Sequence, residues 1–105
     1  MGTRSREKPE RLAEKLVRIR RALGLSQNEM IRRINASEKI TREDVSKYER
    51  GLREPSLLVL LEYARAAGVW ADVLIDDRLD LPAKLPSASV SEGVRRAVPS
   101  RKKKR

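Results

Sequence analysis

The chain has 105 residues and a formal net charge of +10, and it contains neither cysteine nor histidine. This length is typical of one domain with short extensions. The missing residue types exclude disulfides and thiol nucleophiles, and they remove the commonest general base and metal ligand. No apolar run approaches the roughly 20 residues of a membrane-spanning helix, and the N-terminus lacks the apolar region of a signal peptide. We therefore expect a soluble, cytoplasmic protein with no metal, no cofactor and no membrane contact.

The charge is unevenly distributed along the chain. Residues 10–53 carry 12 basic and 7 acidic side chains, and residues 82–105 carry 8 basic and 1 acidic. Residues 54–81 carry 2 basic and 6 acidic side chains. This polarity is typical of a protein that turns one face toward a polyanion, although charged faces are also often simply solvated.

The first predicted helix follows a short basic arm. Residues 1–9 have no apolar periodicity and are interpreted as a flexible arm that ends at Pro9. The next apolar residues recur at i, i+4, i+7 and i+11, which predicts an amphipathic helix ended by Gly24. These residues are Leu12, Leu16, Ile19 and Leu23, and the basic residues off this line are Arg11, Lys15, Arg18 and Arg21.

Two short helices are predicted between residues 26 and 51. The first runs from about residue 27 to residue 34, and Ser26 and Glu29 have the spacing of a capping box at its start. A polar connection follows it. The second runs from about residue 42 to residue 50.

The second of these helices has the same kind of start signal. Thr41 and Asp44 are three residues apart, as a capping box requires, and Val45 and Tyr48 supply apolar anchors. Neither helix is long enough to be stable alone in water, so both need a shared core. Two short helices joined in this way are typical of units that insert one helix into the major groove of DNA.

Two more helices complete the predicted domain, which we place at residues 10–81. Ser56 caps one that ends at Gly68, with an apolar stripe of Leu57, Leu60, Leu61 and Ala64. The other runs from Trp70 to about Asp76. From Pro82 the periodicity stops, and residues 82–105 are interpreted as a disordered basic tail. The fold class is all-α, a compact bundle of five helices.

Three segments together resemble the Cro/repressor-type helix-turn-helix family, also called the xenobiotic-response-element family of transcriptional regulators. They are IRRALGLSQNEM at 19–30, VSKYERG at 45–51 and REPSLLVLLEYARAAGV at 53–69. The resemblance covers residues 10–76. It implies a lambda-repressor-like fold of five helices, of which the second and third bind double-stranded DNA.

The resemblance also implies roles for particular residues. Arg20 of the first helix would pair with Glu49 near the end of the third helix. Base contacts would come from the exposed side of the third helix, which holds Arg42, Glu43, Ser46 and Lys47. Phosphate contacts would come from Ser26, Gln27, Asn28, Arg50 and Arg53. Helix N-termini attract anions and arginine suits guanine, so the chemistry agrees with these roles.

The sequence departs from the family pattern at two places. The connection between the second and third helices is about four residues longer than usual, at Asn35 to Glu38. It either shifts the third helix or bulges outward. Glu43 and Asp44 are acidic where small polar residues are more usual. We interpret Asp44 as a helix cap, and Glu43 as either a cap or an acceptor for cytosine.

Four large apolar residues fall where the family pattern has exposed polar ones. They are Leu58, Leu61, Trp70 and Val73. An excess of apolar groups on an outer face indicates an interface, here a two-fold dimer. The alternatives are an unpaired apolar surface, or a Trp70 that folds into the core.

We therefore predict a sequence-specific DNA-binding regulator, and more specifically a repressor. The alternative is an antitoxin or co-regulator that binds a toxin or another regulator as a protein-interaction module. An enzyme is not expected, because no nucleophile stands beside a plausible base. The cluster of Asp72, Asp76, Asp77 and Asp80 is either a solvated helix end or an attractor of a hard cation. Few aromatic residues are present for stacking on RNA bases.

Overall fold

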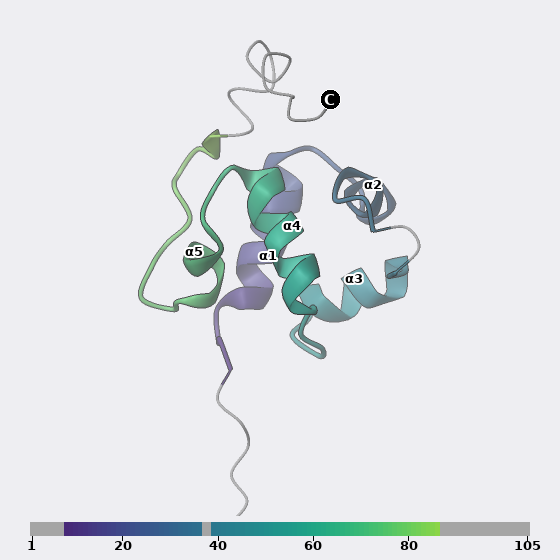
Figure 1. Cartoon of the computed structure of the whole chain (residues 1–105), viewed down its shortest axis with the longest axis horizontal. Helices are drawn as coiled ribbons and strands as arrows, with labels where there is room; N and C mark the ends of the chain where they lie inside the picture. Colours follow the sequence, from purple (N-terminus) through teal and green to yellow (C-terminus); the bar gives the residue numbers. More distant parts are fainter. Residues whose placement is uncertain (1–7, 37–38, 87–105) are drawn as a thin grey trace, which may run out of the picture.

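The computed structural model describes residues 8–36 and 39–86, which form five helices around one core (Figure 1). The helices are α1 (Leu12–Ala22), α2 (Gln27–Arg33), α3 (Arg42–Glu49), α4 (Leu57–Ala67) and α5 (Ala71–Ile75). No strand occurs within the two described ranges. Helix α1 contacts α3, α4 and α5, while α2 packs on α3. The predicted all-α bundle is confirmed.

Both predicted capping boxes are present. The Glu29 N–H donates to Ser26 Oγ at 3.0 Å, and the Ser26 N–H donates to Glu29 Oε1 at 2.8 Å. Thr41 and Asp44 exchange the same two bonds at the start of α3. Because the first N–H groups of a helix have no partner within it, these side chains stabilise the starts of two helices that are too short to form alone.

The face that α4 turns to the core differs from the predicted stripe. Leu57 is 78% exposed and Leu61 is only partly buried, so these two residues are not core anchors. The buried residues of α4 are Val59, Leu60, Tyr63, Ala64 and Ala67. Tyr63 is the largest fully buried side chain in the described ranges. Its burial sets the rotation of the helix and turns Leu57 toward solvent.

The long connection between α2 and α3 is anchored in the core at both ends. Asn35 turns the chain with a φ of 58°, a backbone conformation that asparagine tolerates better than most residues. Ala36 and Ile40 are buried, and the Ala36 carbonyl accepts hydrogen bonds from the N–H groups of Lys39 and Ile40. Residues 37–38 lie outside the described residues.

Lys15 is buried in the core side of α1, against the expectation that it lies off the apolar line. Its side chain is 1% exposed, and Nζ donates to the carbonyls of Val73 and Leu79 at 2.8 Å and of Asp76 at 3.1 Å. Burial lowers the pKa of this ammonium. Three carbonyl acceptors match its three donors, which makes burial of the charge tolerable.

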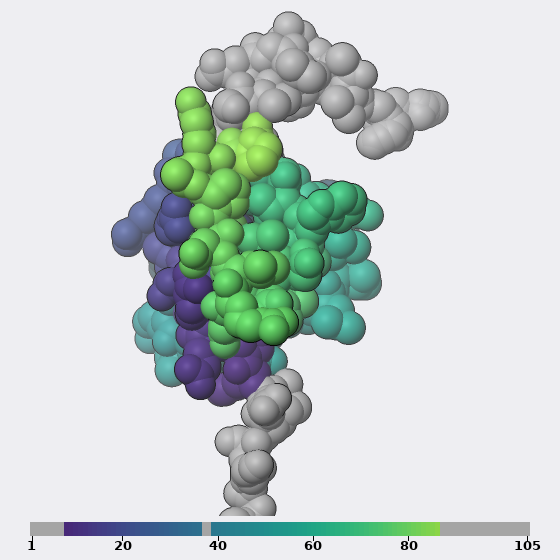
Figure 2. Space-filling model, turned by 90° about the vertical axis from the view of Figure 1, so that its left-hand side faces the viewer, coloured from purple at the N-terminus to yellow at the C-terminus, as the bar shows by residue number. Residues whose placement is uncertain are grey.

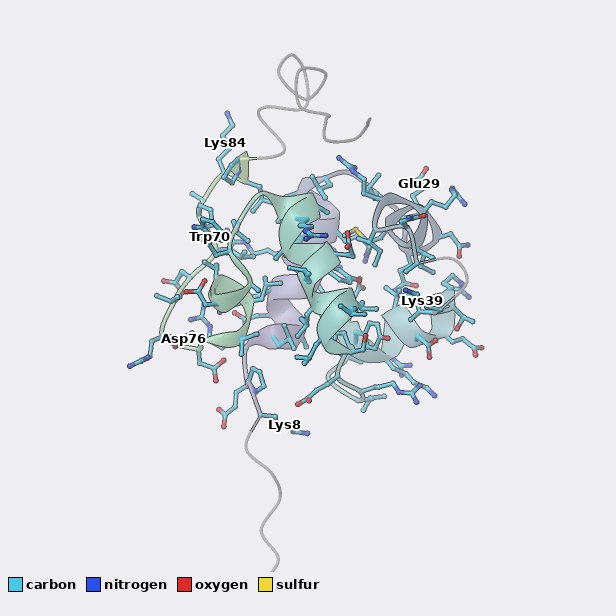
Figure 3. All side chains as sticks on the ribbon, in the orientation of Figure 1. Lys8, Glu29, Lys39, Trp70, Asp76 and Lys84 are labelled. Carbon is cyan, nitrogen blue, oxygen red and sulfur yellow. The ribbon has the colours of Figure 1, made fainter. Side chains whose placement is uncertain are left out.

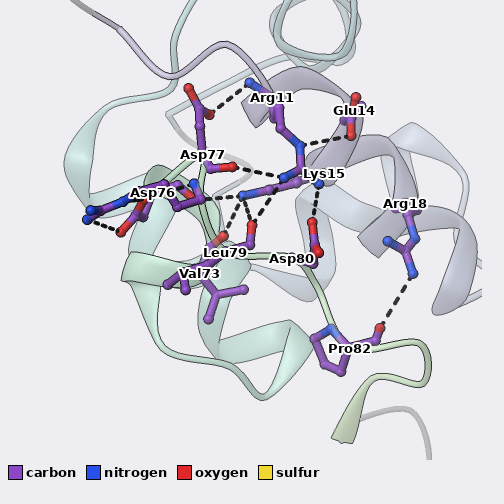
Figure 4. Close-up of polar contacts among 11 residues, drawn as sticks. Arg11, Glu14, Lys15, Arg18, Val73, Asp76, Asp77, Leu79, Asp80 and Pro82 are labelled. Carbon is purple, nitrogen blue, oxygen red and sulfur yellow. Dashed lines mark hydrogen bonds and ion pairs between the residues drawn. The ribbon is translucent and has the colours of Figure 1, made fainter.

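The start of α1 is capped by a residue from the far end of the domain (Figure 4). The Asp77 carboxylate accepts the backbone N–H groups of Glu10 at 2.9 Å and Arg11 at 3.0 Å. Arg11 reaches back, with Nη1 donating to the Asp77 carbonyl and Nη2 to Asp80 Oδ1. These bonds attach α1 to the segment that follows α5.

The packed structure continues beyond Leu81, where the predicted domain ends. Leu81 and Leu85 are both 4% exposed and belong to the core cluster. In Figure 2 this segment is the lightest green and lies at the top of the domain, whereas the purple start of α1 lies at the bottom. The expected disorder therefore does not describe residues 82–86. The rest of the tail, from residue 87, and most of the arm, residues 1–7, lie outside the described residues.

The Asp77 cap predicts a loss of stability in acid. The two backbone hydrogen bonds hold the pKa of Asp77 below its usual value. A carboxylate whose pKa is lower in the folded than in the unfolded state adds stability above the unfolded value, and this is lost as pH falls through the folded one. We expect Asp77→Asn to lower the urea midpoint at pH 7, and to lose less stability than the wild type below about pH 4.

Circular dichroism during urea titration at several pH values measures this effect. Asp72→Asn, at an exposed carboxylate on α5, is the matched control and should leave the midpoint at pH 7 unchanged. Equal acid sensitivity of wild type and Asp77→Asn would show that the cap contributes nothing.

Candidate nucleic-acid interface

A nearly buried ion pair joins the first helix to the third. Arg20 Nε donates to Glu49 Oε2 at 2.6 Å and Arg20 Nη2 donates to Glu49 Oε1 at 3.0 Å. The side chains are 16% and 7% exposed. This two-pronged geometry is the strong form of an arginine–carboxylate contact. The pair that the family resemblance implied is therefore present.

The same carboxylate also binds the second helix. Gln27 Nε2 donates to Glu49 Oε1 at 3.1 Å, and Arg20 Nη1 donates to the Leu25 carbonyl at 2.9 Å. Three helices and the connection between α1 and α2 thus meet at the Arg20–Glu49 pair. The orientation of α2 relative to α3 is consequently fixed by directional bonds as well as by apolar packing.

The outward side of α3 carries charged groups that are free to meet a ligand. Arg42, Glu43 and Lys47 are exposed, and Ser46 is partly buried. Within residues 8–36 and 39–86, none of the three charged side chains forms an ion pair. Glu43 and Lys47 are four residues apart, so they lie on the same face of the helix.

The five residues that are expected to contact phosphates differ in their exposure and in the hydrogen bonds that they form within the protein. Ser26 and Asn28 are exposed at the first turn of α2, and Gln27 is partly buried there. Arg50 Nε donates to the Ser46 carbonyl at 3.3 Å, and Arg53 Nη1 donates to Asp44 Oδ1 at 3.0 Å. Figure 3 shows Glu29 at the outer side of α2 and Lys39 near the start of α3.

The two acidic residues at the start of α3 have different environments. Asp44 accepts hydrogen bonds from Thr41 and Arg53, and these contacts lower its pKa, with the Thr41 N–H as the main cause. Its interpretation as a helix cap is confirmed. Glu43 is exposed and has no ion-pair partner among the described residues. Of the two carboxylates, Glu43 is therefore the more accessible to a ligand of α3.

Sequence reasoning missed two contacts of this region. One is the hydrogen bond between Gln27 and Glu49, and the other is the ion pair between Asp44 and Arg53. Gln27 had been assigned to phosphate alone. Its Nε2 carries two hydrogens, so one donor remains after the bond to Glu49. Neither contact has a signal in residue spacing, because each joins different elements.

The acidic cluster after α5 is engaged by the protein itself. Arg78 donates to Asp76 from its backbone N–H and its guanidinium, which lowers the pKa of Asp76 to about 2. Asp77 and Asp80 bind the start of α1. In the described part of the chain, no three His, Cys, Asp or Glu residues are grouped to hold a metal ion. The described helices include none long and apolar enough to cross a membrane.

These features define a helix-turn-helix protein, in which α2 and α3 form the paired unit and α3 presents its charged side. A family model described as helix-turn-helix matches residues 11–73, which is more than half of the chain. The chain belongs to this family, of the Cro/repressor type, and is a DNA-binding transcription regulator. No curated protein and no solved structure matches it.

The Arg20–Glu49 pair yields a prediction for stability. Removing one partner leaves the other charge nearly buried and unpaired, so Glu49→Ala and Arg20→Ala should each cost about 3–5 kcal/mol of unfolding free energy. The double variant should lose less than the sum of the two. Arg21→Ala, at an exposed arginine next to Arg20, should change stability by less than about 0.5 kcal/mol.

Urea denaturation followed by circular dichroism gives these free energies. Strictly additive losses would show that the two side chains do not interact in solution.

Proposed function

We propose that this regulator reads DNA by inserting α3 into the major groove. The supporting observation is that α3 presents the exposed side chains of Arg42, Glu43 and Lys47, which form no ion pair among the described residues, while nearly buried bonds hold the helix itself. A helix of about 10–12 Å diameter fits a groove about 12 Å wide. Arginine and lysine match the O6 and N7 acceptors of guanine, glutamate accepts from cytosine N4, and Ser46 contacts either kind of group.

Phosphate contacts would fix the position of α3 in the groove. Ser26, Gln27 and Asn28 lie at the start of α2, and the N-terminus of a helix favours an anion. The second Nε2 hydrogen of Gln27 is available for a phosphate oxygen, while the first holds Glu49. Arg50 and Arg53 would contact the backbone beyond the end of α3.

We further propose that the protein acts as a homodimer, and as a repressor by occupying its site. Trp70 is 82% exposed and Leu58 is 65% exposed, which is unusual for such large apolar groups. Leu61 and Val73 are partly buried and would contribute their exposed edges. A two-fold dimer of this kind meets half-sites spaced by about 10–10.5 base pairs.

Selection of bound duplexes from a random DNA pool, repeated at two salt concentrations, tests the function. We expect a palindromic motif and an affinity that falls steeply with salt. Salt-sensitive binding without any motif would contradict sequence-specific reading. It would favour a protein partner, such as a toxin, as the main ligand.

Variants of α3 and α2 should separate base contacts from phosphate contacts. Arg42→Ala or Lys47→Ala should cost roughly 1–3 kcal/mol on the selected duplex and relax the preference at one base position. Gln27→Ala should weaken binding to all sequences about equally. Arg78→Ala is the control. It also removes one positive charge, but at a residue after α5, and it should leave the base preference unchanged. An unaltered preference in the Arg42 and Lys47 variants would refute the base contacts.

The dimer prediction is tested at its two most exposed residues. Trp70→Ala and Leu58→Glu should give monomers in analytical ultracentrifugation, because each removes apolar contact area or introduces charge. Leu52→Glu is a matched control, since Leu52 is also 65% exposed but lies outside the proposed interface. Dimers that persist in both Trp70→Ala and Leu58→Glu would show that the interface lies elsewhere.

A further inference from the structure

One carboxylate at the start of α3 has two separate tasks. Asp44 Oδ2 accepts the Thr41 N–H at 3.0 Å, which caps the helix. Asp44 Oδ1 accepts Arg53 Nη1, also at 3.0 Å, from the segment between α3 and α4. The Asp44 side chain is 24% exposed and the Arg53 side chain 56%. The arginine is therefore held at one end while most of its surface remains open to solvent.

This ion pair lies on the flank of α3 away from Glu49. Glu49 is five positions after Asp44 along α3, and this offset places the two residues about 140° apart around the helix. Gln27 binds Glu49 on one side of α3, so Arg53 stands on the other. Arg53 and Asp44 there line an open cleft of about 440 Å³, together with Lys39 and the α4 cap Ser56. A helix lying in the major groove has a phosphate backbone on each flank.

We propose that Asp44 is a positioning residue, which holds Arg53 against the phosphate backbone of the strand opposite the one that Gln27 contacts. This inference rests on the proposed insertion of α3 into DNA. A guanidinium has five donors and Asp44 occupies one of them, so a phosphate can be bound without breaking the pair. Ordering a free, flexible side chain on binding weakens affinity by roughly two- to tenfold, and the pair removes that cost in advance.

The opposite role for Asp44 would be sequestration of Arg53. In that case the carboxylate competes with phosphate, and the arginine contributes to binding only after Asp44 is neutralised. The two roles predict opposite signs for the coupling between Asp44 and Arg53 in DNA affinity. A purely structural cap predicts no coupling.

A double-mutant cycle on the full-length chain distinguishes these roles. The affinity of wild type, Asp44→Asn, Arg53→Gln and the double variant is measured on the selected duplex and on a scrambled one. We expect Arg53→Gln to weaken binding about tenfold in the wild-type background and only about two- to threefold in Asp44→Asn. The wild-type salt slope should fall by about one in Arg53→Gln. The double-mutant cycle cancels the general effect on DNA affinity of removing a negative charge.

Two further variants control for charge and for folding. Glu14→Gln removes another carboxylate that is paired with an arginine, the partly buried Arg11, and should be additive with Arg53→Gln. Asp44→Glu keeps the charge and the acceptor of the capping box, so it should restore most of the coupling even if Asp44→Asn is poorly folded.

Each outcome separates the inference from the proposed function. Zero coupling, or a larger loss in the Asp44→Asn background, overturns the positioning role while the wild-type preference for the selected duplex still stands. A wild type that binds both duplexes equally overturns the proposed sequence reading, and with it the inference.

Discussion

The geometry of the candidate interface depends on the carboxylate of Glu49. This side chain is 7% exposed and accepts hydrogen bonds from Arg20 on α1 and Gln27 on α2 while it lies near the end of α3. Charged groups that are removed from water need complete pairing, and here the donors to Glu49 come from two other helices. Apolar packing alone would allow α3 to slide or rotate slightly, whereas directional bonds at short range penalise such movement. A helix of only 8 residues can therefore present its outer side chains in a defined direction.

Much of the acidic charge after α4 stabilises the fold rather than facing a partner. Asp77 caps α1, Asp80 pairs with Arg11, and the carbonyls around Asp76 surround the ammonium of Lys15. The acidic part of the sequence thus also serves contacts within the protein. The acidic segment binds the start of α1 and surrounds Lys15, while the charged side chains on the outer side of α3 are exposed. The distribution of charge along the sequence therefore does not by itself give the distribution of charge on the surface.

Local signals predicted the helices well, and contacts between distant residues escaped them. Capping boxes and apolar spacing are short-range patterns, so the starts of α2 and α3 follow directly from Ser26 and Thr41. Lys15 was misplaced although it lies three residues after Leu12 and four before Ile19, because a charged side chain was assumed to be solvated. The acceptors that allow its burial lie more than 55 residues away. For the interface, the resemblance to a family supplied the Arg20–Glu49 pair, while the tie between Asp44 and Arg53 required the arrangement in space.

The burial of Lys15 has a consequence for where the folding unit ends. The family model stops at residue 73, yet the ammonium takes two of its three acceptors from Asp76 and Leu79. Leu81 and Leu85 lie further along and complete the same core. A fragment trimmed to the matched residues would contain α1 to α4 in full, but Lys15 would lose two of its three acceptors and the apolar core would be open to water. The segment that matches the family and the segment that forms the core are thus of different lengths, and an isolated domain should retain the chain through residue 86.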